Sequence, residues 1–268
     1  MLKSVSYVIK ENMTNIYRIF CIAKYELLAD MRDSKFGLFW NFASPAIQVI
    51  TYWLVFGIGM QRKGYNGVPY LPWVIVGFAA WWYISPCITS GCSAVFSKKN
   101  VITKMKFPIS VLPATVCVKE FFNHLCMMAI TVVMLLIFGY YPSIYWLGLV
   151  YYAFCAFMFL ESLSLVTSVL TMMWRDVKKL VTSLMRMLLY LSPVLWPASF
   201  SGIHFMSFLM KLNPVYYIVT GYRDCMFFEK GIFAHPALTI YFWGIVIILF
   251  LIGSALMYHF KRKMVDMI

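Results

Sequence analysis

Five long stretches of this chain contain no Asp, Glu, Lys or Arg, and these stretches limit the possible fold more than any other feature. They are residues 36–60, 64–97, 121–160, 187–210 and 231–260. A helix needs about 20 predominantly apolar residues to cross the hydrocarbon core of a membrane. The stretch at 121–160 is long enough for more than one crossing. The sequence therefore predicts a protein that spans a membrane several times.

Composition supports this interpretation and excludes several classes of protein. Only 12% of the 268 residues are charged, against about 25% in a soluble globular domain. The net charge of +13 comes from basic residues between the apolar stretches, not from a basic stripe, so no nucleic-acid partner is expected. Seven cysteines without a CxxC pair and four scattered histidines predict packing residues and no metal site. HExxH and GxSxG motifs are absent, and no catalytic residue is expected.

The expected fold is an all-α integral membrane bundle with six transmembrane helices. We place the spans near residues 38–60, 72–95, 109–138, 145–173, 179–197 and 237–260. Residues 1–36 carry apolar residues three and four positions apart beside basic ones, which predicts an amphipathic helix at the membrane surface. The chain is expected to be one domain, 1–268, with the bundle at 38–260 and a tail at 261–268.

The segment between the last two spans, residues 198–236, is too apolar for an ordinary loop. It is broken by Gly202, Asn213-Pro214 and Gly221. Two short re-entrant helices fit this pattern better than an extra pair of spans, because broken backbone at membrane depth must be shielded by protein.

The distribution of Lys and Arg predicts the orientation. Sixteen fall on one side of the predicted membrane, in the N-terminal segment, the connections 97–108 and 174–179, and the C-terminal tail. Five fall on the other side. Positive residues favour the cytoplasmic side, so both termini are expected in the cytoplasm.

Four ionisable residues lie within the predicted spans: Lys119, Glu120, Glu161 and Arg186. A lone charge at the bilayer centre costs about 2.5–3.5 kcal/mol on insertion scales. Lys119 and Glu120 are sequence neighbours and point about 100° apart on a helix. We therefore expect cross-helix pairs in which Glu161 meets Lys119 or Arg186. Structural stabilisation and substrate contact both remain open as roles.

Aromatic residues make up 19% of the chain. One interpretation is an interfacial belt, and the other is a lining for a sugar chain, whose C–H surfaces stack on ring faces. Ser192-Pro193 predicts a kink beside two of the candidate lining residues, and the candidates are Phe39, Phe42, Tyr52, Tyr190 and Trp196. Basic residues at the predicted cytoplasmic mouth would attract phosphate groups or serve topology alone, and they are Arg32, Lys35 and Arg175.

Several segments together resemble one family over essentially the whole chain. No single segment is decisive, but their order and spacing are specific. They are Gly37-Leu38-Phe39-Trp40 with Pro45, Tyr52-Trp53-Leu54-Val55-Phe56-Gly57, Gly67-Val68-Pro69-Tyr70, Lys104-Met105-Lys106-Phe107-Pro108, Arg175-Asp176, Leu191-Ser192-Pro193-Val194-Leu195-Trp196, and Asn213-Pro214-Val215-Tyr216-Tyr217 with Tyr222-Arg223. The chain resembles the ABC-2 type permeases and, within them, the teichoic acid translocation permeases.

The resemblance implies a homodimer in the bacterial cytoplasmic membrane, bound to two copies of a separate ABC ATPase. Such a complex exports a polymer attached to an undecaprenyl diphosphate lipid, and membrane lipid surrounds it. This chain has no GxxxxGK[ST] motif, so ATP and Mg²⁺ are expected in the partner ATPase. The chain itself is expected to be a transport subunit that is not an enzyme and binds no cofactor.

The resemblance also implies roles for two segments on the cytoplasmic side. The N-terminal helix would rest against the ATPase, and residues 97–108 would form a coupling helix that transmits ATP-driven closure. The implied coupling residues are Lys98, Lys99, Lys104, Lys106, Phe107 and Pro108. Alternatives left open are a permease for O-antigen or capsular polysaccharide, an integral-membrane enzyme acting on lipid-linked sugars, and a channel.

Overall fold

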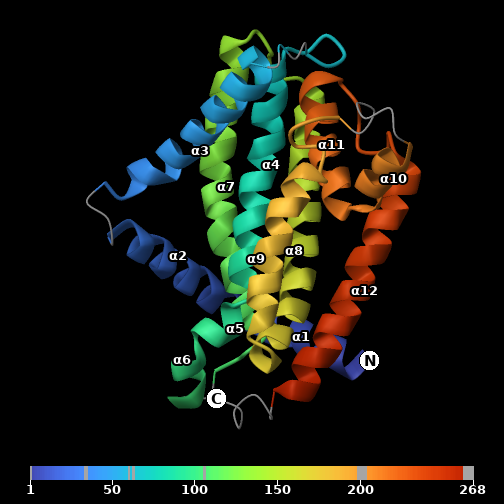
Figure 1. Ribbon diagram of the computed structural model, residues 1–268. Coiled ribbons are helices and arrows are strands. Elements are labelled where there is room, and N and C mark those ends of the chain that lie inside the picture. Colours follow the sequence, from blue (N-terminus) through green and yellow to red (C-terminus); the bar gives the residue numbers. More distant parts are fainter. Residues whose placement is uncertain are drawn as a thin grey trace.

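The computed structural model describes residues 2–32, 36–59, 61, 64–104, 107–197 and 204–261. Almost all of them lie in helices, and the described part of the chain has one isolated β-bridge, between Tyr65 and Val68, and no named strand. The prediction of an all-α fold is confirmed. Figure 1 shows long helices side by side, with α1, α5 and α6 at one end of the bundle and α10 and α11 toward the other. We call these the basal and distal ends.

Four helical segments are long and apolar enough to cross a membrane. They match the second, third, fourth and sixth predicted spans, and they are α4 (Tyr70–Gly91), α7 (Val111–Ile137), η2 with α8 (Ile144–Leu147 and Gly148–Met173) and α12 (Pro236–Phe260). These charge-poor helices indicate a membrane protein, as the long apolar stretches predict.

The other two expected spans are shorter helices. The first is α3 (Leu38–Tyr52), which continues as the π-helix η1 (Trp53–Gly59). The fifth is α9 (Asp176–Tyr190), and residues after Leu191 form turns up to Trp196. The expected kink at Pro193 is wrong: α9 ends before it, because proline lacks an N–H and disfavours helix in the residue before it. Six crossings remain a prediction.

The helix α4 lies at the centre of the bundle. Residues of α4 such as Val74, Phe78 and Ile84 are fully buried, and α4 packs against α7, α8, α9 and α11. The closest pairing in the outer layer joins α12 to α8, where Gly253 lets the two backbones approach beside Leu165. Hydrophobic residues on all sides of α4 therefore reflect burial among other helices.

Helix ends follow the local sequence. Helix α7 ends at Ile137, and Gly139 has φ +83°. The N–H of Tyr140 donates to the carbonyl of Leu135 at 2.9 Å, and the N–H of Gly139 donates to the carbonyl of Leu136 at 3.1 Å. This pair of bonds is a Schellman cap, and it ends α7 before the turn that leads to η2. Asn213 caps α11 (Pro214–Phe227) by accepting from the N–H of Val215 at 3.0 Å.

The N-terminal segment contains two helices where one was expected. They are α1 (Leu2–Thr14), which packs on α12, and α2 (Ile16–Arg32), which packs on α7. The break falls at Asn15, whose side chain bonds to the carbonyl of Glu11 at 2.7 Å; Asn competes with helix in this way. Apolar side chains on both helices remain exposed, among them Ile9, Met13, Tyr17, Phe20 and Tyr25.

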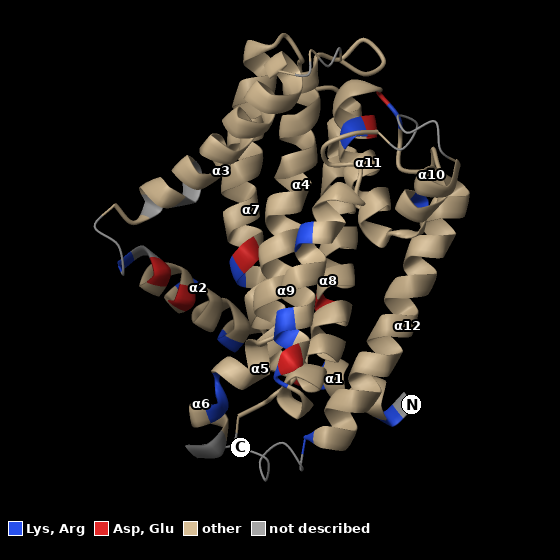
Figure 2. Ribbon diagram, viewed as in Figure 1, with Lys and Arg blue, Asp and Glu red and all other residues tan. Residues whose placement is uncertain are grey.

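Short helices complete both ends. At the basal end, α5 (Ala94–Ser97) and α6 (Lys99–Lys104) connect α4 to α7, and at the distal end α10 (His204–Leu212) precedes α11. Both α10 and α11 lie in the segment expected to hold two re-entrant helices. Figure 2 shows charged residues concentrated on α2, at the basal end and around α11, with few along the bundle.

Candidate functional site

A network of polar contacts joins the N-terminal helices to the segment between α4 and α7. The ammonium of Lys98 lies 2.6 Å from the carboxylate of Glu26 on α2. On α1, Glu11 accepts from the hydroxyl of Tyr7 at 2.6 Å and also from the hydroxyl of Ser110, at the start of α7. Burial and the Glu11 carboxylate both raise the pKa of Tyr7 above its usual range. The N-terminal helices are therefore fastened to this segment at two points, Lys98 and Ser110.

The expected coupling residues lie in or beside α6. Lys99 lies 5.5 Å from the centre of the Phe96 ring. Phe107 packs against a cluster of buried residues that includes Val95, Ile102 and Leu112. The carbonyl of Pro108 accepts from the N–H of Val111 at 3.3 Å. Lys106 and the side chain of Lys104 lie outside the described residues. Coupling remains a prediction for all six.

The structure corrects the expected charge pairs. Lys119 on α7 places its ammonium 2.5 Å from Asp30 on α2 and 3.9 Å from Glu120. A lysine at this depth reaches the membrane interface along its apolar stem, so it meets α2 and does not meet Glu161. The buried Glu161 has one carboxylate oxygen without a hydrogen-bond partner among the described residues. Arg186 is exposed on α9 and has no ion pair in the described part of the chain.

Three of the five aromatic candidates lie together on the face formed by α3, η1, α4 and the end of α9. Tyr52 stacks on Phe78 with ring centres 5.2 Å apart, and Trp196 lies 5.9 Å from Tyr190. Phe56 links the two groups, 6.0 Å from Tyr52 and 6.4 Å from Trp196. We call Tyr52, Phe56, Phe78, Trp82, Tyr190 and Trp196 the aromatic face.

Phe39, Arg32 and Arg175 are not part of the aromatic face. Phe39 is exposed near the start of α3, beside Phe36 and Trp40, while the side chain of Phe42 lies outside the described residues. Arg32 is exposed at the end of α2, Lys35 lies outside the described residues, and Arg175 lies 5.3 Å from the centre of the Phe96 ring.

The distal end contains a polar site that sequence reasoning missed. Arg223 on α11 is buried, and its guanidinium lies over the Trp73 ring, 3.3 Å from the ring centre. It donates to the carbonyl of Trp73 at 3.3 and 3.2 Å, to that of Val194 at 2.9 Å, and to that of Pro193. Arg223 thereby ties α11 to α4 and to the turns after α9.

Gly77 makes the position of Arg223 possible. A Cβ at residue 77 would collide with the guanidinium and lie 2.8 Å from the carbonyl oxygen of Val194. Only glycine leaves room for the charged group at this point of α4.

Next to Arg223, the carboxylate of Asp224 is nearly buried and holds two basic side chains. One oxygen lies 3.3 Å from the ammonium of Lys230, and the other lies 2.9 Å from the Nε2 atom of His235. The backbone N–H of Lys230 also donates to the carbonyl of Asp224 at 3.0 Å. Asp224 therefore orders the loop between α11 and α12.

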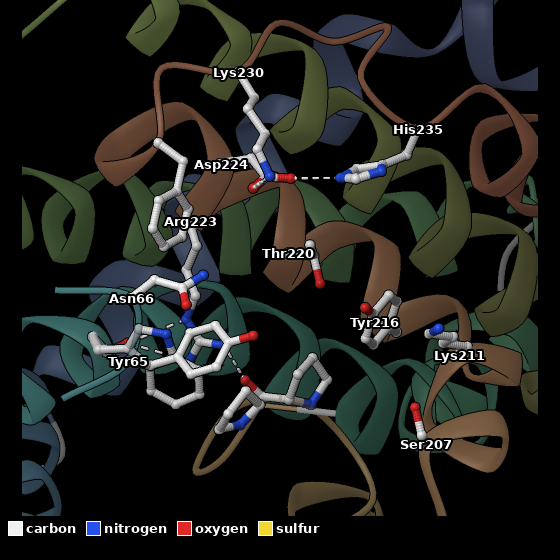
Figure 3. Close-up of a pocket in the computed structure, with 14 residues that line it drawn as sticks. Tyr65, Asn66, Ser207, Lys211, Tyr216, Thr220, Arg223, Asp224, Lys230 and His235 are labelled. Carbon is white, nitrogen blue, oxygen red and sulfur yellow. Dashed lines mark hydrogen bonds and ion pairs between the residues drawn. The ribbon is translucent and has the colours of Figure 1, made fainter. Parts of the chain in front are cut away.

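These groups line a cavity of about 260 Å³, shown in Figure 3. A tight hairpin forms one wall: Asn66 and Gly67 both have positive φ, as Asn-Gly turns require. Helices α10 and α11 and the loop after α11 form the others. The lining includes Tyr65, Asn66, Trp73, Ser207, Lys211, Tyr216, Thr220, Arg223, Asp224, Phe228, Lys230 and His235. We call it the distal pocket.

The sequence contains the residues of the distal pocket, but their pattern does not predict that they form a site. Three Lys or Arg residues lie in the segment before α12, and they are Lys211, Arg223 and Lys230. In the predicted orientation they lie on the side opposite the cytoplasm, where positive residues are disfavoured, and the sequence says nothing more about them. Nothing in the spacing predicts that Arg223 turns inward while Lys211 stays outside. The described residues contain no group of three or more His, Cys, Asp or Glu that could hold a metal ion.

Comparison with known proteins identifies the family. Residues 17–227 match the model of the ABC-2 type transporter family. The chain is similar to the O-antigen export system permease protein RfbA of Myxococcus xanthus, 26% identical over 210 residues, which cover 78% of this chain and 79% of that protein. The protein of the same name from Klebsiella pneumoniae is 24% identical over 249 residues, 92% of this chain and 93% of that protein. This chain belongs to the ABC-2 type transporter family.

Proposed function

We propose that this chain is the permease subunit of an ATP-driven exporter that carries a lipid-linked polysaccharide of the O-antigen class across the cytoplasmic membrane. The observation that carries the proposal is the match to O-antigen export permeases, which extends over 92% of the chain. Teichoic acid was the first expectation, from sequence resemblance. The relatives reported above favour the O-antigen alternative, so the polysaccharide replaces teichoic acid here.

The basal end is the proposed cytoplasmic side and ATPase surface. Its basic residues fit that side, and α1, α5 and α6 lie at that end of the bundle (Figure 1). We propose that two copies of an ABC ATPase hold the ATP and Mg²⁺ and press on α6 when they close. Lys98–Glu26 and Ser110–Glu11 would pass this movement to α2 and α1, because ion pairs and hydrogen bonds make the three helices move together.

The path for the polymer is proposed between two copies of this chain. A hydrophilic polymer cannot cross hydrocarbon, so each subunit must contribute a wall that is shielded from lipid. The aromatic face is suited to this role, because ring faces stack on the C–H surfaces of sugars and Tyr hydroxyls donate hydrogen bonds. Tyr190 on this face is 46% exposed, and Tyr52 and Trp196 are partly exposed, so each offers surface to a polymer.

Co-purification with the partner ATPase tests the proposal. The chain and the candidate ATPase are expressed together, isolated through a tag on this chain, and placed in lipid nanodiscs. ATP hydrolysis is then measured with lipid-linked O-antigen, with lipid-linked teichoic acid precursor, and with the lipid carrier alone. We expect a stable complex whose hydrolysis rises with O-antigen above the level with the carrier.

Charge reversal at the basal end supplies a matched control. Lys98→Glu should weaken the response to O-antigen. Lys178→Glu, at an exposed lysine near the start of α9, reverses an equal charge and should leave the response unchanged. A complex without ATPase would contradict the exporter assignment. A response to the teichoic acid precursor alone would overturn the choice of polysaccharide while keeping the exporter.

A further inference from the structure

The distal pocket carries more positive charge than its own carboxylate neutralises. Asp224 is paired with Lys230 and His235, so this carboxylate is fully engaged. Among the described residues, Arg223 donates to carbonyl oxygens, which satisfy its hydrogen bonds but leave its charge, because arginine stays protonated in proteins. Lys211 has no ion-pair or hydrogen-bond partner among the described residues of the pocket or elsewhere.

Lys211 is exposed and lines the distal pocket. It stands in the last turn of α10, and Figure 3 shows it on the wall of the pocket near Ser207 and Tyr216. The cavity thus has one buried cation, one cation without a partner and one balanced cluster. An anion entering it would gain electrostatic stabilisation from both unbalanced charges in a partly water-excluded space.

The remaining lining favours a particular kind of anion. Ser207, Tyr216 and Thr220 offer hydroxyls, and Asn66 offers an amide. Tyr65 and Phe228 supply ring surface beside them, whereas the ring of Trp73 is covered by the guanidinium of Arg223. Hydroxyls and rings together recognise a sugar, since one face of a sugar is apolar and its edge is polar. A volume of about 260 Å³ lies below the usual range for drug-sized ligands and is suited to a single ring with its charged group.

We propose that the distal pocket binds an anionic sugar unit, that is, one sugar ring bearing a phosphate or carboxylate. Lys211 contacts the anion, and the charge of the buried Arg223 stabilises it. The hydroxyls of Ser207 and Thr220 form hydrogen bonds with the sugar ring. Under the proposed function, on which the identity of the natural ligand rests, the pocket holds a charged unit of the polymer at the outer side. A phospholipid headgroup carries the same anionic chemistry and is the alternative source.

Binding of a defined probe tests the site without requiring transport. The full chain is placed in phosphatidylcholine nanodiscs, and binding of glucose 1-phosphate, inorganic phosphate and glucose is followed by saturation-transfer NMR or by competition. Wild-type protein should bind glucose 1-phosphate most tightly, phosphate less tightly and glucose least. Binding should weaken as salt rises, because mobile ions screen the charges.

Variants at Lys211 separate charge from structure. Lys211 is exposed, so its replacement should not disturb folding. Lys211→Ala should raise the Kd for glucose 1-phosphate by about tenfold, in the range for a hydrogen bond to a charged group, and Lys211→Arg should restore most of the affinity. Ser207→Ala should weaken binding of glucose 1-phosphate while leaving binding of inorganic phosphate unchanged. Lys178→Ala removes an equal charge at the opposite end and should have no effect.

Two results would overturn the site. One is unchanged affinity in Lys211→Ala, and the other is an equal loss in Lys178→Ala, which would mean that net charge alone is responsible. Adding phosphatidylglycerol to the nanodiscs assigns the source of the anion. If this lipid competes with glucose 1-phosphate in the wild-type protein and the competition disappears in Lys211→Ala, the ligand is a lipid headgroup. If binding of glucose 1-phosphate is unchanged by the lipid, the ligand is the polymer unit. Loss of the ATPase complex would refute the exporter assignment but leave this binding result intact.

Discussion

The ammonium of Lys119 on α7 lies 2.5 Å from the carboxylate of Asp30 on α2. This contact links a long apolar helix to the N-terminal helix that packs on it at the basal end. Because Asp30 is mostly exposed while Lys119 is mostly buried, the two ends of the pair should differ in their contribution to stability.

Lys119→Met should lower the thermal stability of the folded chain more than Asp30→Ala. Asp30 is exposed, and an exposed ion pair contributes less than about 1 kcal/mol. Loss of Lys119 also leaves the nearly buried Glu120 without its nearest cation, at a cost of about 2 kcal/mol. Unfolding midpoints in one detergent provide the comparison. The same shift in both variants would show that Lys119 does not support Glu120.

Gly77→Ala should destabilise the distal end. The added methyl group would displace the Arg223 guanidinium from its carbonyl oxygens, leaving a buried charge without its hydrogen bonds. We expect a loss of several degrees in the unfolding midpoint. The control is Gly244→Ala on α12, where an added Cβ meets nothing within 4 Å and alanine favours helix. An equal change of the unfolding midpoint in the two variants would show that Gly77 is not needed to make room for Arg223.

Reversing the Lys98–Glu26 pair should separate ATP hydrolysis from export. Each single change, Lys98→Glu or Glu26→Lys, places like charges at a contact of 2.6 Å and should reduce export per ATP hydrolysed. The double variant restores the attraction and should recover most of the coupling. Polymer exported per ATP is the measurement. A double variant no better than the singles would show that the pair does not transmit movement.

Removing rings from the aromatic face should slow export without unfolding the chain. Tyr190→Ala and Trp196→Ala delete partly exposed rings and should reduce export several-fold, while Trp196→Phe keeps a ring and should retain most activity. Tyr141→Ala removes an exposed ring from the turn between α7 and η2 and serves as the control. Full export in Tyr190→Ala and Trp196→Ala would assign these rings to the membrane interface alone.

Charge-free stretches predicted the helical class and four of the spans, because length and hydropathy alone decide those features. Shorter elements were harder. The sequence predicted the fifth span at 179–197, but the helix ends at Tyr190. Pro193 disfavours a continuing helix even though the residues around it are apolar. The interfacial segment contains two helices, because one Asn side chain competes for the backbone at a single position.

Pairing between distant residues was the part that sequence did not predict. Lys119 was expected to meet Glu161, yet it reaches Asp30 because α2 folds back against α7. The distal pocket depends on the same kind of information: Arg223 contacts residues 150 and 30 positions away in the chain. Helical period and hydropathy contain no information on the register between such segments.

Translocation into inverted membrane vesicles tests whether this chain is the permease of a polysaccharide exporter. Vesicles that contain this chain and its ATPase expose the cytoplasmic face, and a labelled lipid-linked O-antigen polysaccharide is added outside with ATP. The account predicts that the polysaccharide becomes protected from an added glycosidase in an ATP-dependent manner, and that vesicles lacking this chain give no protection. ATP-independent protection, or protection equal in vesicles without this chain, would contradict the claim that this protein is the permease of a polysaccharide exporter.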